Sequence, residues 1–168
     1  TMLNHHLLFR VTLLNIAAGV GVIWAHANGY VMPVFTSDTT NISYGIAALF
    51  VVGMASVYWR AWKIGGAKDM LKAGTARAHV ERRAAKMFAK NEHIADIVNW
   101  LLGLGLLGTI VGFSMALGSM SADDPAGVES AMRTAIGTTI IGTILSMWLD
   151  VARRMLDTAT AVLAEDMS

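Results

Sequence analysis

Charged residues are scarce in this sequence, and cysteine is missing altogether. Only 15% of the 168 residues are Asp, Glu, Lys or Arg, against about 25% in an average globular protein. Without cysteine the chain has no disulfide framework, no thiol chemistry and no cysteine-based metal site. Together with a mean hydropathy of +0.53, the shortage of charge favours an integral membrane protein over a soluble domain.

Four apolar runs are long enough to cross a bilayer, at about residues 11–34, 42–62, 97–120 and 131–150. A helix needs about 20 residues to span the hydrocarbon core. Only helices and closed barrels satisfy their backbone groups there, and none of the runs alternates with the period of a strand. The sequence therefore predicts an all-α integral membrane protein, with four transmembrane helices in a single membrane domain over residues 1–168.

Lysine and arginine are concentrated on one side of the predicted membrane. Nine of the 13 lie in the connection from Arg60 to Lys90, Arg10 precedes the first run, and Arg153 and Arg154 follow the fourth. The connections near 32–41 and 118–130 contain neither residue type. By the positive-inside rule, both termini and the long connection are expected to be cytoplasmic.

The long connection, about residues 60–96, is rich in Ala, Lys, Arg, Met and Glu and has no proline. This composition predicts a cytoplasmic helical hairpin, with its break near residues 64–66 or at Gly74. Residues 150–165 are expected to continue the fourth helix into the cytoplasm. Residues 1–27 also resemble a signal peptide, and cleavage there would leave three helices in the same orientation. The apolar run continues to Val34, which favours retention of the segment.

The third run carries an unusual number of glycines on one face. At 100° per residue, Gly105, Gly108, Thr109 and Gly112 fall on one stripe of the helix. The GxxxG pair Gly108 and Gly112 lets another helix approach closely. We therefore expect the glycines to face protein, and the predicted helix-packing positions are Gly105, Gly108, Gly112, Gly137 and Gly142.

The fourth run is rich in hydroxyl groups. Thr134 and Thr138 share one stripe, and Thr139, Thr143 and Ser146 lie on a different side. Such hydroxyls commonly bond to a carbonyl of their own helix or hold helices together, and the alternative is that they line a hydrated path. No acidic residue lies mid-membrane in any run, although an ion carrier needs an ionisable group at that depth. If ions pass through this chain, a partner must supply that group.

Two segments carry a family resemblance. The sequences GLLGTIVGF (105–113) and VESAMRTAIGTTIIGTIL (128–145) resemble the MotA/TolQ/ExbB proton channel family. The resemblance matches Thr109 and Thr134 to threonines of the family, and Glu129 to its acidic residue near the outer end of the last helix. It implies an ion path past Thr109, Thr134, Thr138 and Glu129. It also implies a homopentamer around two copies of a MotB-, ExbD- or TolR-like single-span partner that carries an aspartate.

By this resemblance, the chain is expected to be the pore-forming subunit of a motor driven by ion-motive force in the bacterial cytoplasmic (inner) membrane. The coupling ion would be H⁺ or Na⁺, and no other cofactor is expected. The four spans look like the flagellar arrangement, but the cytoplasmic stretch is short for a rotor-engaging domain. The alternative is a non-conducting membrane scaffold. The histidines are not spaced like metal ligands, so we expect no metal site. No set of catalytic residues is recognisable, so we expect neither an enzyme nor a nucleic-acid-binding protein.

Overall fold

The computed structural model describes residues 2–36, 38, 40–72 and 77–165, and this part of the chain consists of five helices without a strand. Four of them are long and apolar enough to cross a membrane, which confirms the predicted all-α fold class with four spans. The helices are α1 (Met2–Ala27), α2 (Val31–Thr36), α3 (Ile42–Lys72), α4 (Arg77–Ser121) and α5 (Pro125–Glu165).

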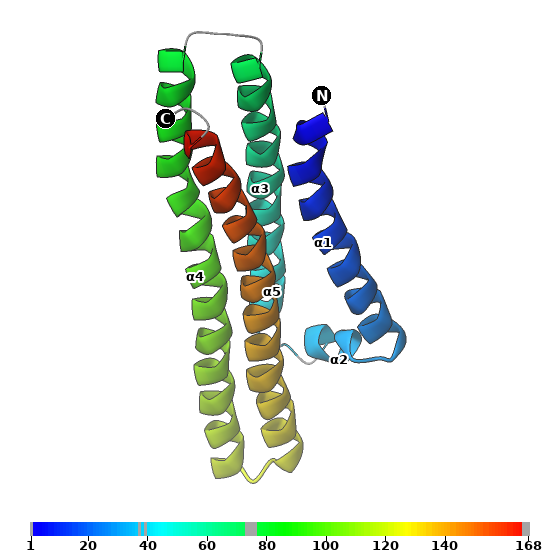
Figure 1. Cartoon of the computed structure of the whole chain (residues 1–168). Coiled ribbons are helices and arrows are strands. Elements are labelled where there is room, and N and C mark those ends of the chain that lie inside the picture. Colours follow the sequence, from blue (N-terminus) through cyan, green and yellow to red (C-terminus); the bar gives the residue numbers. More distant parts are fainter. Residues whose placement is uncertain (1, 37, 39, 73–76, 166–168) are drawn as a thin grey trace.

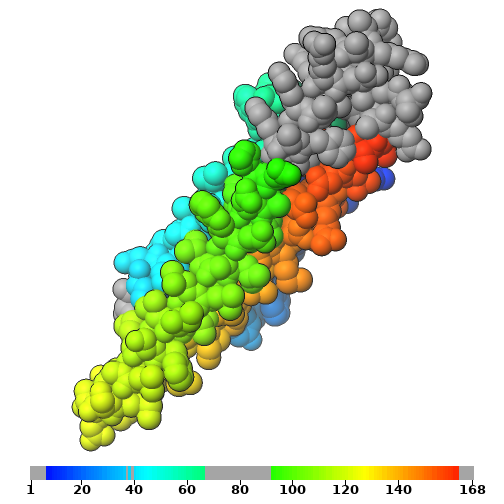
Figure 2. All heavy atoms as spheres, turned by 90° about the vertical axis from the view of Figure 1, so that its left-hand side faces the viewer, coloured from blue at the N-terminus to red at the C-terminus, as the bar shows by residue number. Residues whose placement is uncertain are grey.

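The two longest helices, α4 and α5, lie side by side and antiparallel along most of their length (Figure 1). Helix α3 packs against both of them, and α1 leans against α3 and α5. The start of α1, the end of α3, the start of α4 and the end of α5 lie at one end of the molecule, whereas the α4–α5 turn lies at the other (Figure 1). The space-filling view in Figure 2 shows the resulting elongated shape.

Helix α1 ends earlier than the predicted span 11–34, which is therefore not one continuous helix. Gly29 adopts a φ of +76°, a left-handed conformation that residues with a Cβ rarely adopt. The Tyr30 amide donates to the Ala25 carbonyl at 3.0 Å, and the Gly29 amide donates to the His26 carbonyl at 2.9 Å. This pair of bonds is a Schellman motif, which satisfies the last carbonyls of α1 and turns the chain into α2.

The helices on either side of the long connection are continuous with membrane spans. Helix α3 passes through residues 64–66 without a break and ends at Lys72, and α4 begins at Arg77. The other predicted break, Gly74, lies outside the described residues. Helix α5 continues without interruption to Glu165, so the predicted C-terminal helix is the last part of α5.

A tight turn joins α4 to α5. Asp123 adopts a φ of 54° and ends α4 in a second Schellman motif, with the Asp124 amide donating to the Ser119 carbonyl at 3.0 Å. Asp124 Oδ1 then accepts the Gly127 amide at 3.1 Å, which makes Asp124 the N-cap of α5. Pro125 occupies the first helical position, where a missing N–H is harmless. The turn thus fixes the two helices as neighbours.

The apolar core lies where α3, α4 and α5 meet, mostly in the half of the molecule nearest the chain ends. Its largest fully buried side chains include Val57, Ile64, Ile94, Leu101, Leu149 and Leu156. Gly53 admits Leu149 to this core, since a Cβ on Gly53 would lie 2.5 Å from Leu149 Cδ2. Toward the α4–α5 turn, the contact between these two helices consists of small and hydroxyl residues instead.

Candidate functional site

Glycines of α4 bring its backbone against α5. A Cβ on Gly105 would lie 3.3 Å from the Cα of Gly142, and one on Gly112 would lie 2.7 Å from the Ala135 Cβ. A Cβ on Gly108 would lie 2.3 Å from the Thr138 hydroxyl. Apolar burial alone does not drive helices together in lipid, so such close backbone contact is a main source of their association.

Gly142 belongs to this contact from the α5 side, since a Cβ there would lie 2.8 Å from both the Gly105 Cα and the Leu101 carbonyl. Gly137 has a different neighbour, because the nearest side chain is Val34 of α2, 2.7 Å from the position of the missing Cβ. Four of the predicted packing glycines therefore lie between α4 and α5, and Gly137 admits α2.

Thr109 lies in the same contact, and its hydroxyl hydrogen-bonds the hydroxyl of Thr139 on α5. Each hydroxyl also reaches the carbonyl four residues earlier in its own helix, at 3.2 Å from Thr109 to Gly105 and 2.9 Å from Thr139 to Ala135. The crossed distances, from Thr109 to the Ala135 carbonyl and from Thr139 to the Gly105 carbonyl, are both 3.4 Å. We call these four oxygen atoms the hydroxyl pair site.

The hydroxyl pair site has more acceptors than protons. Two hydroxyl protons are available to four oxygen atoms, and each hydroxyl oxygen keeps lone pairs that can accept a further hydrogen bond. Both threonine side chains are half-buried. The hydroxyl groups of such an arrangement can rotate. They can then accept a hydrogen bond from a neighbouring donor, or bind a small cation, while part of the internal hydrogen bonding remains.

Thr134 and Thr138 lie close by but are enclosed by protein. Thr138 has no exposed surface, packs on Gly108, and donates to the Thr134 carbonyl at 2.9 Å. Thr134 is 1% exposed and donates to the Ser130 carbonyl at 3.2 Å. The structure thus brings Thr109 together with Thr139, which sequence reasoning had placed on a separate side from Thr134 and Thr138.

Glu129 lies near the start of α5, where its carboxylate is exposed and pairs with Arg133 at 2.7 Å. A second charged group lies toward the chain ends, where Arg153 bonds both Asp150 and Asp157 at 2.9 Å. Arg154 shares Asp150 at 2.8 Å. We call the residues from Asp150 to Asp157 the α5 charge cluster. Among the described residues, no group of His, Cys, Asp or Glu could hold a metal ion.

Sequence reasoning missed one polar network inside the membrane-spanning helices. The Asn15 amide donates to the Tyr58 hydroxyl at 3.0 Å, and the Trp148 indole N–H donates to the Asn15 amide oxygen at 2.9 Å. The network connects α1, α3 and α5. A polar side chain within an apolar span is the signal that predicts such a partner, since leaving an amide unpaired in hydrocarbon is costly.

The family model described as the MotA/TolQ/ExbB proton channel family matches residues 40–168. The chain belongs to this family. It is thus a multi-pass membrane protein of the ion-channel type, and α3, α4 and α5 lie within the matched region. No curated protein and no solved structure matches the chain. Helices α1 and α2 lie before the matched residues, so they are features of this family member that the family model does not cover.

Proposed function

We propose that this MotA/TolQ/ExbB family member is the pore-forming subunit of a motor driven by ion-motive force. The observation that carries the proposal is the hydroxyl pair site, formed by Thr109 and Thr139 among the glycines that bring α4 and α5 together. The predicted spans contain no acidic residue at mid-membrane depth. A proton path at that depth needs an ionisable group, and an aspartate on the helix of a MotB-, ExbD- or TolR-like partner meets this need.

The proposed assembly is a homopentamer around two copies of that single-span partner, in the bacterial cytoplasmic membrane. The coupling ion is H⁺ or Na⁺. The start of α1, the end of α3, the start of α4 and the end of α5 lie at one end of the molecule (Figure 1). This placement supports an orientation in which that end faces the cytoplasm, as the distribution of Lys and Arg predicts.

Within this proposal the predicted path residues have different surroundings. Thr109 offers a half-buried hydroxyl at the hydroxyl pair site. Glu129 is exposed near the start of α5, where an entering cation meets it first. Thr134 and Thr138 are enclosed within the chain, so their hydroxyls support the path by shaping the α4–α5 contact.

The direct test is Thr109→Val, which removes the hydroxyl from the pair while keeping a similar side-chain volume. The assay is ion uptake into vesicles that contain the assembly together with its co-expressed single-span partner. We expect Thr109→Val to abolish uptake while the oligomer remains intact, because the partner's acid then loses its neighbour in the path. The matched control is Thr158→Val, which removes an exposed α5 hydroxyl that donates to the Arg154 carbonyl at 2.9 Å. Normal uptake by Thr109→Val contradicts the proposal.

The alternative, a non-conducting scaffold, is favoured by one observation. The glycine contacts between α4 and α5 account for the close approach of the two helices without any ion path. A scaffold would lose its assembly when Gly112 is replaced by Leu, since a Cβ at that position would lie 2.8 Å from the Ala131 carbonyl. It would be indifferent to Thr109→Val. Thr109→Val therefore separates the two functions, because Gly112→Leu disturbs the α4–α5 contact on which both of them depend.

A further inference from the structure

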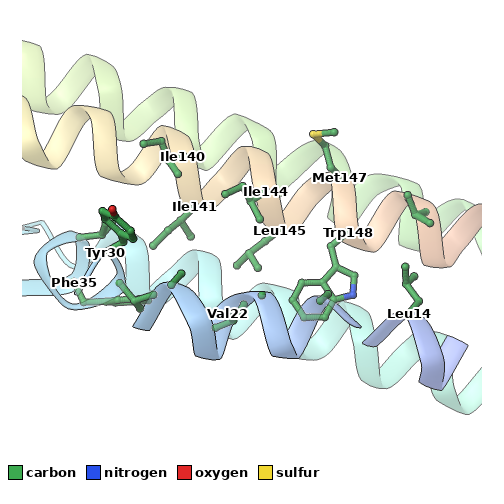
Figure 3. Close-up of a pocket in the computed structure, with 16 residues that line it drawn as sticks. Leu14, Val22, Tyr30, Phe35, Ile140, Ile141, Ile144, Leu145, Met147 and Trp148 are labelled. Carbon is green, nitrogen blue, oxygen red and sulfur yellow. The ribbon is translucent and has the colours of Figure 1, made fainter. Parts of the chain in front are cut away.

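An apolar groove runs between α1 and α5, and α2 lies across one end of it. Its volume is about 600 Å³. Figure 3 shows Ile141 and Leu145 of α5 pointing toward α1, with Trp148 and Leu14 toward one end of the groove and Tyr30 toward the other. Both long walls belong to helices that can span a membrane. The groove therefore lies at a depth where lipid is the solvent.

The lining excludes polar ligands. Of the side chains that line the groove, only those of Tyr30 and Trp148 carry a polar atom, and the Trp148 N–H is already bound to Asn15. A water molecule needs two or more polar partners to remain in a cavity. In a bilayer such a groove is filled by hydrocarbon, from either a lipid chain or a protein helix.

The size of the groove favours a lipid chain. Its α5 wall extends from Ile140 to Val151, a rise of about 17 Å in a helix. This length is about half of the roughly 30 Å hydrocarbon core, which matches an extended acyl chain that enters from one leaflet. A spanning helix of a second subunit or a partner would extend well beyond both ends of the groove.

The two ends of the groove differ in charge. Arg10 lies one turn beyond Leu14 on α1, and Arg154 lies one turn beyond Val151 on α5, so a cation borders each wall at the end near the chain termini. The Arg154 side chain is 73% exposed although it shares Asp150. At the other end, Val34 of α2 packs on Gly137, and Arg133 is paired with Glu129.

We propose that the α1–α5 groove binds one acyl chain of an anionic phospholipid, whose phosphate lies between Arg10 and Arg154. The lipid comes from the leaflet on the side of the chain termini, and its assignment to the cytoplasmic leaflet rests on the orientation proposed above. The chain binds along Ile141, Leu145 and Trp148. One wall and one end of the site belong to α1 and α2, which the matched family region does not include.

The test uses the intact oligomer in mild detergent, incubated with equal amounts of phosphatidylglycerol and phosphatidylcholine that have the same acyl chains. Native mass spectrometry then counts the lipids that each chain retains. Gly21 lines the groove and Gly19 does not, and neither has an atom within 4 Å of an added Cβ. We expect wild type and Gly19→Trp to retain about one phosphatidylglycerol per chain, and Gly21→Trp to retain none because the indole fills the groove.

The charge of the headgroup is tested with Arg10→Gln and Arg154→Gln. We expect each substitution to lower the preference for phosphatidylglycerol about fivefold, the effect of losing one cation at an anionic surface. Equal retention of the two lipids by wild type overturns the proposal, and so does equal retention by Gly19→Trp and Gly21→Trp. If Gly21→Trp dissociates the oligomer while lipid binding persists, the occupant is a second subunit and the proposal is wrong.

A photoreactive phosphatidylglycerol with a diazirine in its acyl chain tests the site without any substitution. Cross-links are expected in residues 14–25 and 140–151 of the wild-type protein. Cross-links confined to the α4 face at residues 102–117 contradict the groove assignment. Neither measurement depends on ion conduction, so a negative result here leaves the proposed channel function standing, and loss of that function leaves the lipid site standing.

Discussion

Gly108→Ala tests whether the α4–α5 contact depends on close backbone approach. The added Cβ would lie 2.3 Å from the Thr138 hydroxyl oxygen, 2.6 Å from the Thr138 Cβ and 2.9 Å from its Cγ2. The obstruction therefore includes Thr138 Cβ, which a rotation about χ1 does not move. Either α4 and α5 must separate or one must turn about its axis, and both movements break the hydroxyl pair site.

The magnitude follows from two opposing effects. Overpacking of a well-packed contact costs about 1–3 kcal/mol, and replacing a helical glycine by alanine returns about 1 kcal/mol. Gly103 supplies the matched control, because it lies in α4 and an added Cβ there would meet nothing within 4 Å. Gly103→Ala shows the propensity effect alone. The unfolding free energy of Gly108→Ala should therefore lie about 1–3 kcal/mol below that of Gly103→Ala.

The assay is reversible unfolding in mixed micelles, in which the loss of helix is followed as the denaturing detergent increases. The second variant is Gly108→Ala combined with Thr138→Gly, which transfers the Cβ from α5 to α4. We expect this pair to recover most of the stability that Gly108→Ala loses, since the two changes act on the same contact. If Gly103→Ala and Gly108→Ala are equally stable, the close approach of the helices at Gly108 does not exist in the folded protein.

Two further variants test other parts of the fold. Asn15→Leu removes the acceptor of the Trp148 N–H and a partner of the Tyr58 hydroxyl. In the same unfolding assay we expect the free energy of unfolding to fall by about 1–2 kcal/mol and the tryptophan emission to shift. Unchanged values contradict the network. For Asp38, burial opposes the charge, but hydrogen bonds from Thr40 and Ser43 outweigh it and hold the pKa below its usual value. Its stabilising contribution is therefore present above the usual pKa of about 3.9 and is lost as the pH falls through the lower folded value. Stability measured from pH 6 to pH 3 should decline less in Asp38→Asn than in wild type, and parallel curves refute this assignment.

Hydropathy was sufficient to predict the four spans, because the bilayer allows few structures other than apolar helices. The boundaries were harder to predict where a local motif decides them. The run 11–34 has continuous apolar character, yet α1 ends at Ala27 because Gly29 adopts a left-handed conformation. The end of α1 depends on the conformation of one glycine, and glycine is also frequent inside membrane helices.

The face of α4 that meets α5 could be predicted from its glycines, whereas the partner on α5 could not. Thr138 and Thr139 are neighbours in sequence, about 100° apart around the helix, and either could point toward Thr109. In the structure Thr138 fills the space above Gly108, and Thr139 reaches Thr109. The choice depends on the register between two helices. That register is fixed by the contact of Gly105 with Gly142. A single sequence does not specify which residue of α5 meets Gly105.

Helix α5 is 41 residues long, which corresponds to about 60 Å and is roughly twice the thickness of the hydrocarbon core. Its only proline is at its first position, and the helix is continuous from Thr139 to the α5 charge cluster. A rotation of this helix about its own axis at Thr139 is therefore passed directly to Arg153 and Asp157. A change in hydroxyl pairing within the membrane would therefore reorient these charges in the C-terminal part of the same helix. No hinge, loop or second chain lies between the two places.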